Sequence, residues 1–198
     1  MLGTHQLQKI RETGLNEEGY SPSMVVGRGA YSLVLRHAQR NDLVVKLTCC
    51  EASVPFLQQL QAAPHEDFVT VHNAQPLGTL PGTELPVHLF VLGRLEAPTP
   101  AELEAVQQKA NVATDRACSG ASRAPRRGTL DYAPFMARYC QAFALLDSER
   151  QRGWELLAEH LREAANPFQS VDVLTPGNLL VRNGRLVFSD PLRIVRPS

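Results

Sequence analysis

The sequence predicts an α+β protein in which a small antiparallel sheet is followed by a lobe made mainly of helices. Short β-prone runs separated by turns succeed one another over residues 24–48. Apolar side chains, several of them aromatic, recur at helical spacing over residues 131–165. Towards the end of the chain, two more β-prone runs flank the pair Asn183-Gly184, which is typical of a tight hairpin.

Composition limits the class of protein. The chain has 198 residues, which suits one domain or two small lobes, and 43% of them are hydrophobic, enough for an apolar core. Its 20 Lys and Arg residues balance its 20 Asp and Glu residues, so electrostatic capture of nucleic acid is not expected. No apolar run is long enough to span a membrane and the first residues lack a signal-peptide pattern, so we expect a cytoplasmic protein without a membrane partner. The 4 cysteines show neither metal-ligand spacing nor a disulfide pattern.

Residues 24–48 carry the first functional pattern, in which three β-prone runs are separated by two turns. Gly27 and Gly29 would let main-chain N–H groups of the first turn approach phosphate oxygens, where a side chain would collide. Lys46, inside the β-branched third run, would direct one positive charge towards the same phosphates. A lone lysine in such a run is more often an edge-strand residue facing water, so the prediction depends on a second pattern.

The second functional pattern lies near the end of the sequence. Asp172 opens a loop that reaches Asn178, a hairpin follows, and Asp190 comes after its second strand. Asn178 and Asp190 should therefore lie at neighbouring strand ends, where their oxygens suit a magnesium ion held against a phosphate. Asp172 would lie near enough to orient an attacking hydroxyl. The alternative interpretation is an ordinary hairpin with acidic residues on its surface.

Together, the two patterns resemble the nucleotide site of protein kinases and of their small-molecule kinase relatives. Gly27 and Gly29 match the first two glycines of the glycine-rich loop, and Lys46 matches the ATP-anchoring lysine. Asn178 and Asp190 match the metal-binding residues of those kinases. In style the chain is most similar to the small Ser/Thr protein kinase of podovirus-type bacteriophages. Its Pro-Gly-Asn and Ser-Asp-Pro runs are more like those of aminoglycoside and choline kinases.

This resemblance implies a minimal bilobal protein-kinase-like fold with ATP and Mg²⁺ as cofactors. Residues 1–21 would form an N-terminal arm. Residues 22–96 would form an N-lobe with the glycine-rich loop and the ATP-anchoring lysine. Residues 97–198 would form a reduced C-lobe with the catalytic-loop-like and metal-binding motifs.

The resemblance also assigns further residues to nucleotide binding. Ala30 lies in the glycine-rich turn, Tyr31 matches its aromatic tip, and Ser32 stands where a third glycine is often found. Val34 matches the valine that usually packs on adenine. The hinge, whose main chain would read adenine, is expected at Leu95 and Glu96.

Two helices complete the predicted framework. Residues 51–63 carry apolar residues at helical spacing, and Glu51 is the candidate partner of Lys46, although a solvated glutamate is an equally good interpretation. Thr99, Pro100 and Glu102 form a capping-box pattern that predicts a second helix from residue 100.

Departures from the kinase pattern leave the function open. Val173 stands where strict spacing places the catalytic aspartate, and Asp172 comes one residue earlier, so either the loop bulges or the base is missing. The first hypothesis is a Ser/Thr protein kinase that modifies proteins, in a host cytoplasm if the chain is phage-encoded. The second is a pseudokinase-like module that binds and inhibits or recruits a partner protein. The third is a small-molecule kinase of the aminoglycoside type.

Overall fold

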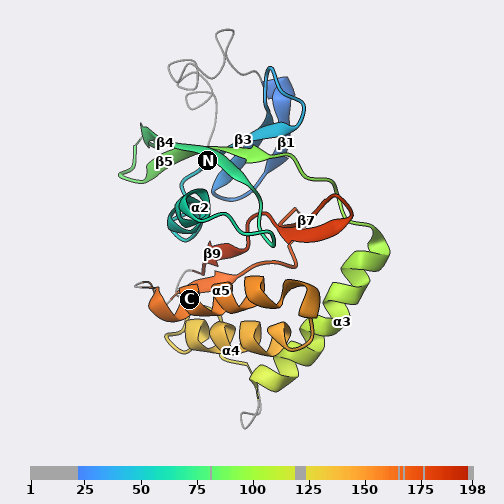
Figure 1. Ribbon diagram of the computed structural model, residues 1–198. Coiled ribbons are helices and arrows are strands. Elements are labelled where there is room, and N and C mark those ends of the chain that lie inside the picture. The colour runs from blue at the N-terminus through green and yellow to red at the C-terminus, as the bar shows by residue number, and fades with distance from the viewer. Residues whose placement is uncertain are drawn as a thin grey trace. The chain divides into compact units, whose positions relative to one another are not determined.

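The computed structural model describes residues 22–80, 82–118, 124–164, 166, 168–175 and 177–195. Within these ranges the chain divides into two compact units, the first from Met1–Pro64 and Val69–Leu95, the second from His65–Phe68 and Glu96–Ser198. Figure 1 shows the ribbon of the chain. The predicted arm at residues 1–21 lies outside the described residues.

The first unit is built on a five-stranded antiparallel sheet with the strand order β1-β2-β3-β5-β4. A short 3-10 turn, η2 (Pro22–Met24), precedes it. The strands are β1 (Val25–Arg28), β2 (Ser32–Arg36), β3 (Leu43–Thr48), β4 (Val71–Thr79) and β5 (Pro86–Gly93). This arrangement confirms the predicted antiparallel sheet.

One face of this sheet is closed by an apolar cluster. Alternate residues of neighbouring strands share a face, so the odd-numbered positions of β2, β3 and β5 point the same way. The fully buried members are Leu33, Leu35, Leu43, Val45, Leu47, Val87, Leu89 and Val91. Each such side chain stabilises the fold by about 1.5–3 kcal/mol relative to exposure.

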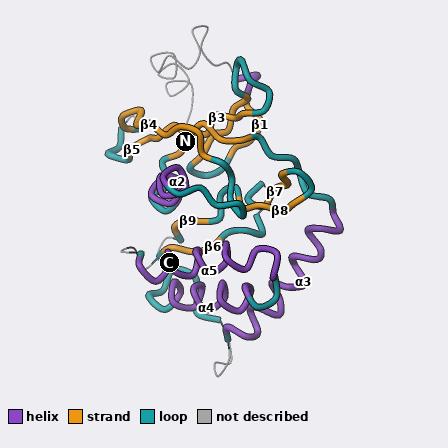
Figure 2. Tube along the Cα trace, in the orientation of Figure 1, coloured by secondary structure: helices purple, strands orange, loops and turns teal. Residues whose placement is uncertain are grey.

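Helix α2 (Ser53–Ala62) confirms the helix predicted over residues 51–63. Pro55 occupies its first turn, where a missing N–H leaves no intrahelical hydrogen bond unmade. Phe56, Leu57 and Leu60 are buried, and the helix contacts β4. Figure 2 shows α2 beside the strands of the first unit.

The helices of the second unit are α3 (Pro100–Ala117), α4 (Tyr132–Ala144) and α5 (Gln151–Glu163), with a 3-10 turn, η3 (Ser148–Arg150), before α5. The predicted capping box of α3 is present: the Thr99 hydroxyl accepts from the Glu102 N–H at 3.3 Å, and the Thr99 N–H donates to the Glu102 carboxylate at 2.7 Å. Helix α4 packs against both α3 and α5, and Figure 1 shows α4 and α5 lying side by side.

Aromatic rings form the core of the second unit. Trp154 of α5 stacks on Phe143 of α4 with ring centroids 4.0 Å apart, and it meets Phe188 edge-on at 4.8 Å. Phe188 in turn contacts Phe68 at 5.2 Å. The contact with Phe68 explains why residues 65–68 group with the second unit, although they precede β4 in sequence.

Two short ribbons complete the second unit. Strand β7 (Leu179–Arg182) pairs with β8 (Arg185–Phe188) across Asn183 and Gly184, whose φ values of 53° and 76° confirm the predicted tight hairpin. Strand β6 (Gln169–Val171) pairs with β9 (Leu192–Ile194). The second pairing was not predicted, because nothing local in the sequence joins residues so far apart.

None of the helices in the described ranges is both long enough and apolar enough to cross a lipid bilayer.

Candidate functional site

In the first unit, the residues predicted to bind nucleotide share one row across the sheet. Gly27 pairs with Val34, and Val34 pairs with Lys46 in the antiparallel register. Directly paired residues point to the same face, so these three lie together on the face opposite the apolar cluster. Lys46 is only 3% exposed. A buried lysine inside a strand differs from the water-facing edge lysine that was the alternative interpretation.

Two hydroxyl groups join the ends of β2 and β3 on the same face. The Ser32 hydroxyl donates to the Thr48 hydroxyl at 2.9 Å, and the Thr48 hydroxyl donates to the main-chain oxygen of Tyr31 at 3.2 Å. These bonds fix the base of the glycine-containing turn. Ser32 therefore has a role in holding the turn, whatever it contacts in a complex.

The glycine-containing turn consists of Gly29, Ala30 and Tyr31. Its Gly29 N–H donates to the Ser32 main-chain oxygen at 2.9 Å, so this N–H is already used. The N–H groups of Ala30 and Tyr31 have no hydrogen-bond partner within the described chain, which leaves them available to a phosphate. A Cβ at Gly27 would meet Val34 at 3.6 Å and one at Gly29 would meet Ser32 at 3.9 Å, both ordinary contacts. The fold itself therefore does not require glycine at either position.

The structure corrects the role of the Tyr31 side chain. Its ring packs against the apolar cluster that includes Leu33 and Leu35, and not at the tip of the turn. Strand alternation is the reason, because residue 31 shares a face with residues 33 and 35. Only the main chain of Tyr31 remains a candidate for nucleotide binding.

Glu51, predicted to pair with Lys46, lies exposed in the turn that precedes α2. Among the described residues Glu51 makes no ion pair. The predicted pairing is therefore not found. Strand β3 continues to Thr48 before the chain turns, which carries Glu51 beyond the row that contains Lys46.

The expected hinge residues behave differently from each other. Glu96 exchanges both of its main-chain hydrogen bonds with Val181, at 2.9 and 2.8 Å. Glu96 could read adenine through its main chain only by breaking this pair, so its assignment is corrected. The N–H and C=O of Leu95 make no hydrogen bond within the described chain, and Leu95 stays a predicted adenine contact.

In the second unit, main-chain hydrogen bonds bring Asp172 close to both predicted metal ligands. The Asp172 N–H donates to the Pro191 main-chain oxygen at 2.7 Å, immediately after Asp190. The Asn178 side-chain amide donates through Nδ2 to the Asp172 main-chain oxygen at 2.6 Å. Asp172 is thus fixed from both sides, at the end of the β6–β9 ribbon.

The hairpin sets Asn178 beside the segment that carries Asp190. Leu179 and Phe188 are paired, and beyond them the Ser189 N–H donates to the Asn178 main-chain oxygen at 2.9 Å. The Ser189 hydroxyl also donates to the Gly177 main-chain oxygen. Gly177 adopts a φ of 88°, a conformation that other residues rarely take, so the turn before Asn178 depends on this glycine.

The donor set fits a magnesium ion. Because Nδ2 of Asn178 is used within the loop, its Oδ1 has no hydrogen-bond donor among the described residues. Asp190 is half-buried and adds a carboxylate. Magnesium is bound by one or two such oxygens together with substrate phosphates and water, and not by a protein cage. The described residues contain no group of three His, Cys, Asp or Glu side chains placed to hold a metal.

The side chains of Asp172 and Val173 differ in burial and in their contacts. Val173 is 2% exposed and packs in the interior. The Asp172 carboxylate accepts from the Thr175 hydroxyl at 2.6 Å and lies 3.4 Å from Nη1 of Arg193, both through Oδ1. Its Oδ2 has no partner in the described part of the chain. Val173 therefore belongs to the interior, and Asp172 keeps one carboxylate oxygen without a partner among the described residues.

A cavity of about 290 Å³ lies beside Asp172, entirely within the second unit. Its apolar wall comes from α4, through Tyr132, Phe135, Met136 and Tyr139. Arg127 and Arg193 provide its positive charges. Sequence analysis did not single out either arginine.

Comparisons with known proteins give only distant matches. No protein-family model matches the chain, and no curated protein does. Among solved structures, a thermostable mutant of aminoglycoside phosphotransferase APH(4)-Ia matches at 14% identity with a TM-score of 0.39, covering 93% of this chain and 70% of that one. Its N202A form with AMP-PNP and hygromycin B matches at 14% identity and a TM-score of 0.40, with coverages of 92% and 70%. An aminoglycoside-3'-phosphotransferase of type VIII matches at 22% identity and a TM-score of 0.37, with coverages of 93% and 76%. TM-scores this low do not establish a shared fold.

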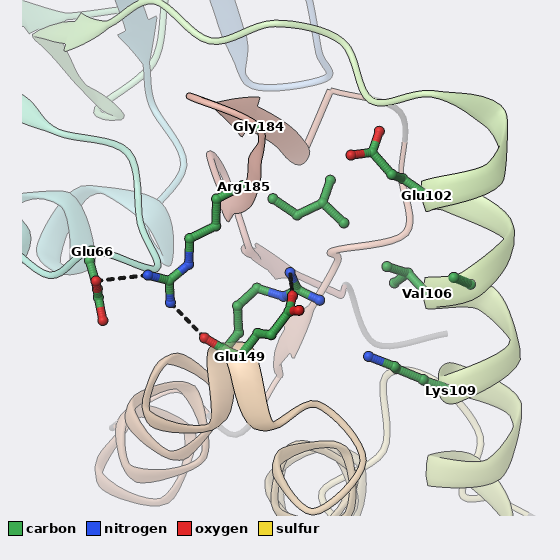
Figure 3. A pocket seen from close by; sticks show the side chains of 10 residues that line it. Glu66, Glu102, Val106, Lys109, Glu149, Gly184 and Arg185 are labelled. Atoms are coloured by element: carbon green, nitrogen blue, oxygen red, sulfur yellow. Dashed lines mark hydrogen bonds and ion pairs between the residues drawn. The ribbon is translucent and has the colours of Figure 1, made fainter.

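A larger pocket of about 710 Å³ lies at the other end of the β7–β8 hairpin, near Gly184 (Figure 3). Its cations are held by carboxylates. Arg185 pairs with Glu66 at 2.7 Å and with Asp67 at 2.5 Å, while Lys109 pairs with Asp147 at 2.9 Å. The positive charges of this pocket are therefore neutralised by neighbouring carboxylates. The pocket lies at the opposite end of the hairpin from Asn178.

Proposed function

We propose that this chain is a Mg²⁺- and ATP-dependent phosphotransferase that acts on a hydroxyl group of a small molecule. The observation that carries the proposal is the hydrogen bond from Nδ2 of Asn178 to the Asp172 main-chain oxygen, which leaves Oδ1 of Asn178 available to a metal ion. The row of Gly27, Val34 and Lys46 supports it independently.

The roles follow from the chemistry of each group. Lys46 and the turn N–H groups would hold the phosphates, and Asn178 and Asp190 would hold magnesium. Bound magnesium would neutralise charge that develops on the transferred phosphoryl group. Asp172 would orient the acceptor hydroxyl and take its proton through Oδ2.

The cavity beside Asp172 favours a small acceptor over a protein. It is a concave site lined by α4 and by the loop that carries Asp172. Only Pro191 separates Asp190 from β9, which leaves no segment there to support a bound peptide. The Ser/Thr protein kinase hypothesis stays a prediction without a supporting observation. The pseudokinase hypothesis likewise stays a prediction.

Nucleotide binding and phosphoryl transfer test the proposal separately. We expect the native chain to bind Mg²⁺·AMP-PNP in calorimetry, and Lys46→Met and Asp190→Asn to weaken that binding. Asp172→Asn should keep the affinity and lower transfer from radiolabelled ATP by at least about 100-fold, the usual contribution of a general base. Gly27→Ala should fold normally and bind less tightly, because only a ligand would collide with its Cβ.

Asp42→Asn serves as the control, since Asp42 is exposed and its recorded ion pair is with Arg40 on the same turn. Its binding and transfer should equal those of the native chain. Failure of the native chain to bind Mg²⁺·AMP-PNP would contradict the proposal.

A further inference from the structure

The cavity beside Asp172 has an excess of positive charge. Arg127 and Arg193 face a single carboxylate, that of Asp172. Arg127 is exposed and makes no ion pair or hydrogen bond within the described residues. The remaining wall is aromatic and apolar, and burial raises the pKa of the Tyr139 hydroxyl, so this phenol adds no negative charge at neutral pH.

We infer that the cavity takes an acceptor that carries an oxyanion, either a carboxylate or a phosphate, on a compact and partly apolar body that also bears the reacting hydroxyl. The inference rests on the proposed phosphotransferase function and names its substrate class. A polycationic acceptor is excluded by the same charges, although the compared structures are of aminoglycoside enzymes.

Arg193 provides the strongest support. Its side chain lines the cavity and is 32% exposed, and its Nη1 lies 3.4 Å from the Asp172 carboxylate. An oxyanion that occupies the cavity would give the same guanidinium a second anionic partner. The planar guanidinium also matches carboxylate and phosphate geometry with two parallel hydrogen bonds.

The size of the cavity limits the acceptor. About 290 Å³ corresponds to roughly ten water molecules at about 30 Å³ each. That volume is at the lower end of the usual range for ligand pockets, about 300–1,000 Å³. An acceptor of one ring or one short chain would fill that volume.

The reaction balances without a further reactant. The acceptor oxygen attacks the γ-phosphorus of ATP, a new O–P bond forms, and the bond from that phosphorus to the β–γ bridging oxygen breaks. ADP leaves with the electron pair of the broken bond. The hydroxyl proton passes to Oδ2 of Asp172 and then to solvent.

Three probes that differ mainly in charge test the inference without nucleotide. They are the anion 3-phenyllactate, its neutral amide, and the cation phenylalaninol. Two further probes extend the series: glycerol 3-phosphate carries a phosphate in place of the carboxylate, and hygromycin B is a polycation. Chemical shifts of the full chain would report binding. We expect one or both anions to bind more tightly than the neutral and cationic probes. Arg127→Gln and Arg193→Gln should each weaken anion binding by about tenfold, the effect of losing one charged hydrogen bond.

Arg138→Gln is the matched control, because Arg138 is an exposed arginine of α4 outside the cavity. Its anion affinity should equal that of the native chain. Equal loss in Arg138→Gln, tighter binding of a cation, or no binding of either anion would overturn the inference. A phosphate preference over 3-phenyllactate would identify which oxyanion the cavity selects.

Measuring both anion binding and Mg²⁺·AMP-PNP binding on the same samples distinguishes failure of this inference from failure of the proposed function. Binding of Mg²⁺·AMP-PNP without anion binding would overturn the acceptor class alone. Anion binding without any binding of Mg²⁺·AMP-PNP would overturn the phosphotransferase, and with it the reaction step assigned to Asp172.

Discussion

Gly153 is fixed by its contact with a buried carboxylate. Its N–H donates to Oδ2 of Asp67 at 2.8 Å, and Asp67 is 1% exposed and also paired with Arg185. A Cβ at residue 153 would lie 2.7 Å from the Asp67 Cβ, closer than real contacts allow. A shift of Asp67 would disturb two interactions at once, because the same carboxylate accepts the hydrogen bond from Gly153 of α5 and pairs with Arg185.

We therefore expect Gly153→Ala to destabilise the protein by about 1–2 kcal/mol. Alanine ordinarily stabilises a helix interior by about 0.5–1 kcal/mol relative to glycine, but overpacking of this kind costs about 1–3 kcal/mol. Urea denaturation measures the difference. Gly29→Ala is the control, since the nearest atom to its Cβ is 3.9 Å away, and its stability should stay within about 0.5 kcal/mol of the native value. Equal stabilities of the two variants would contradict the expectation.

The candidate site could be predicted only in part from single residues. Lys46, Asn178 and Asp190 can be singled out because their types and neighbours suggest one chemistry, and their roles stay predictions. Spacing alone does not say whether Asp172 or Val173 is buried. The folded chain buries Val173 and holds Asp172 through two main-chain hydrogen bonds. Arg193 was missed because its pairing with Asp172 depends on the long-range β6–β9 register.

At the scale of elements, one buried carboxylate joins three segments of the second unit. Asp147 is 1% exposed and accepts two hydrogen bonds of 2.8 Å from Arg150 of η3. It also accepts from Lys109 of α3 at 2.9 Å and from the Trp154 indole of α5 at 3.0 Å. Removing its charge would leave Arg150, itself 4% exposed, as an unpaired buried cation.

Asp147 should make stability depend on acid pH. Burial alone would raise the pKa of Asp147, but the hydrogen bonds from Trp154 and Lys109 and the charges of Arg150 and Lys109 together lower it below the ordinary value of 3.8. A lowered pKa in the folded state means that the unfolded state binds the proton first. The contribution is therefore complete above the ordinary value and is lost as pH falls through the folded-state pKa below it.

Denaturation of native and Asp147→Asn chains across this range checks the expectation. At neutral pH the variant should be less stable by about 3–5 kcal/mol, the usual effect of breaking a buried ion pair. In acid the difference should shrink. Asp42→Asn, at an exposed pair, should follow the native curve. A constant difference between the native and Asp147→Asn chains at all pH values would count against the assignment.

Elements differ in how far the sequence predicts them. The capping box at Thr99 and the Asn183-Gly184 hairpin depend on residues a few positions apart, and both are confirmed. The β6–β9 ribbon joins residues more than 20 positions apart, and the membership of residues 65–68 in the second unit depends on contacts across much of the chain. Only the folded core, through rings such as Phe68 and Phe188, specifies those contacts.

At the scale of the whole molecule, the balanced charges predict how the chain behaves in solution. Its formal net charge is zero at pH 7. Proteins associate most readily when net charge vanishes, so light scattering should show a solubility minimum near neutral pH. The double variant Arg116→Gln with Arg138→Gln removes two exposed positive charges and should move the minimum to lower pH. A minimum that stays in place would show that patches, and not net charge, govern association.

The main-chain anchoring of residue 172 has a consequence for how such a protein evolves. Both of its main-chain hydrogen bonds are independent of the side chain that the position carries. A substitution of Asp172 through a single codon change would therefore leave the groups that make both main-chain hydrogen bonds in place. Under the proposed function, such a substitution would remove the base while the architecture persists. Active and silent alleles of one scaffold would then lie a single mutational step apart.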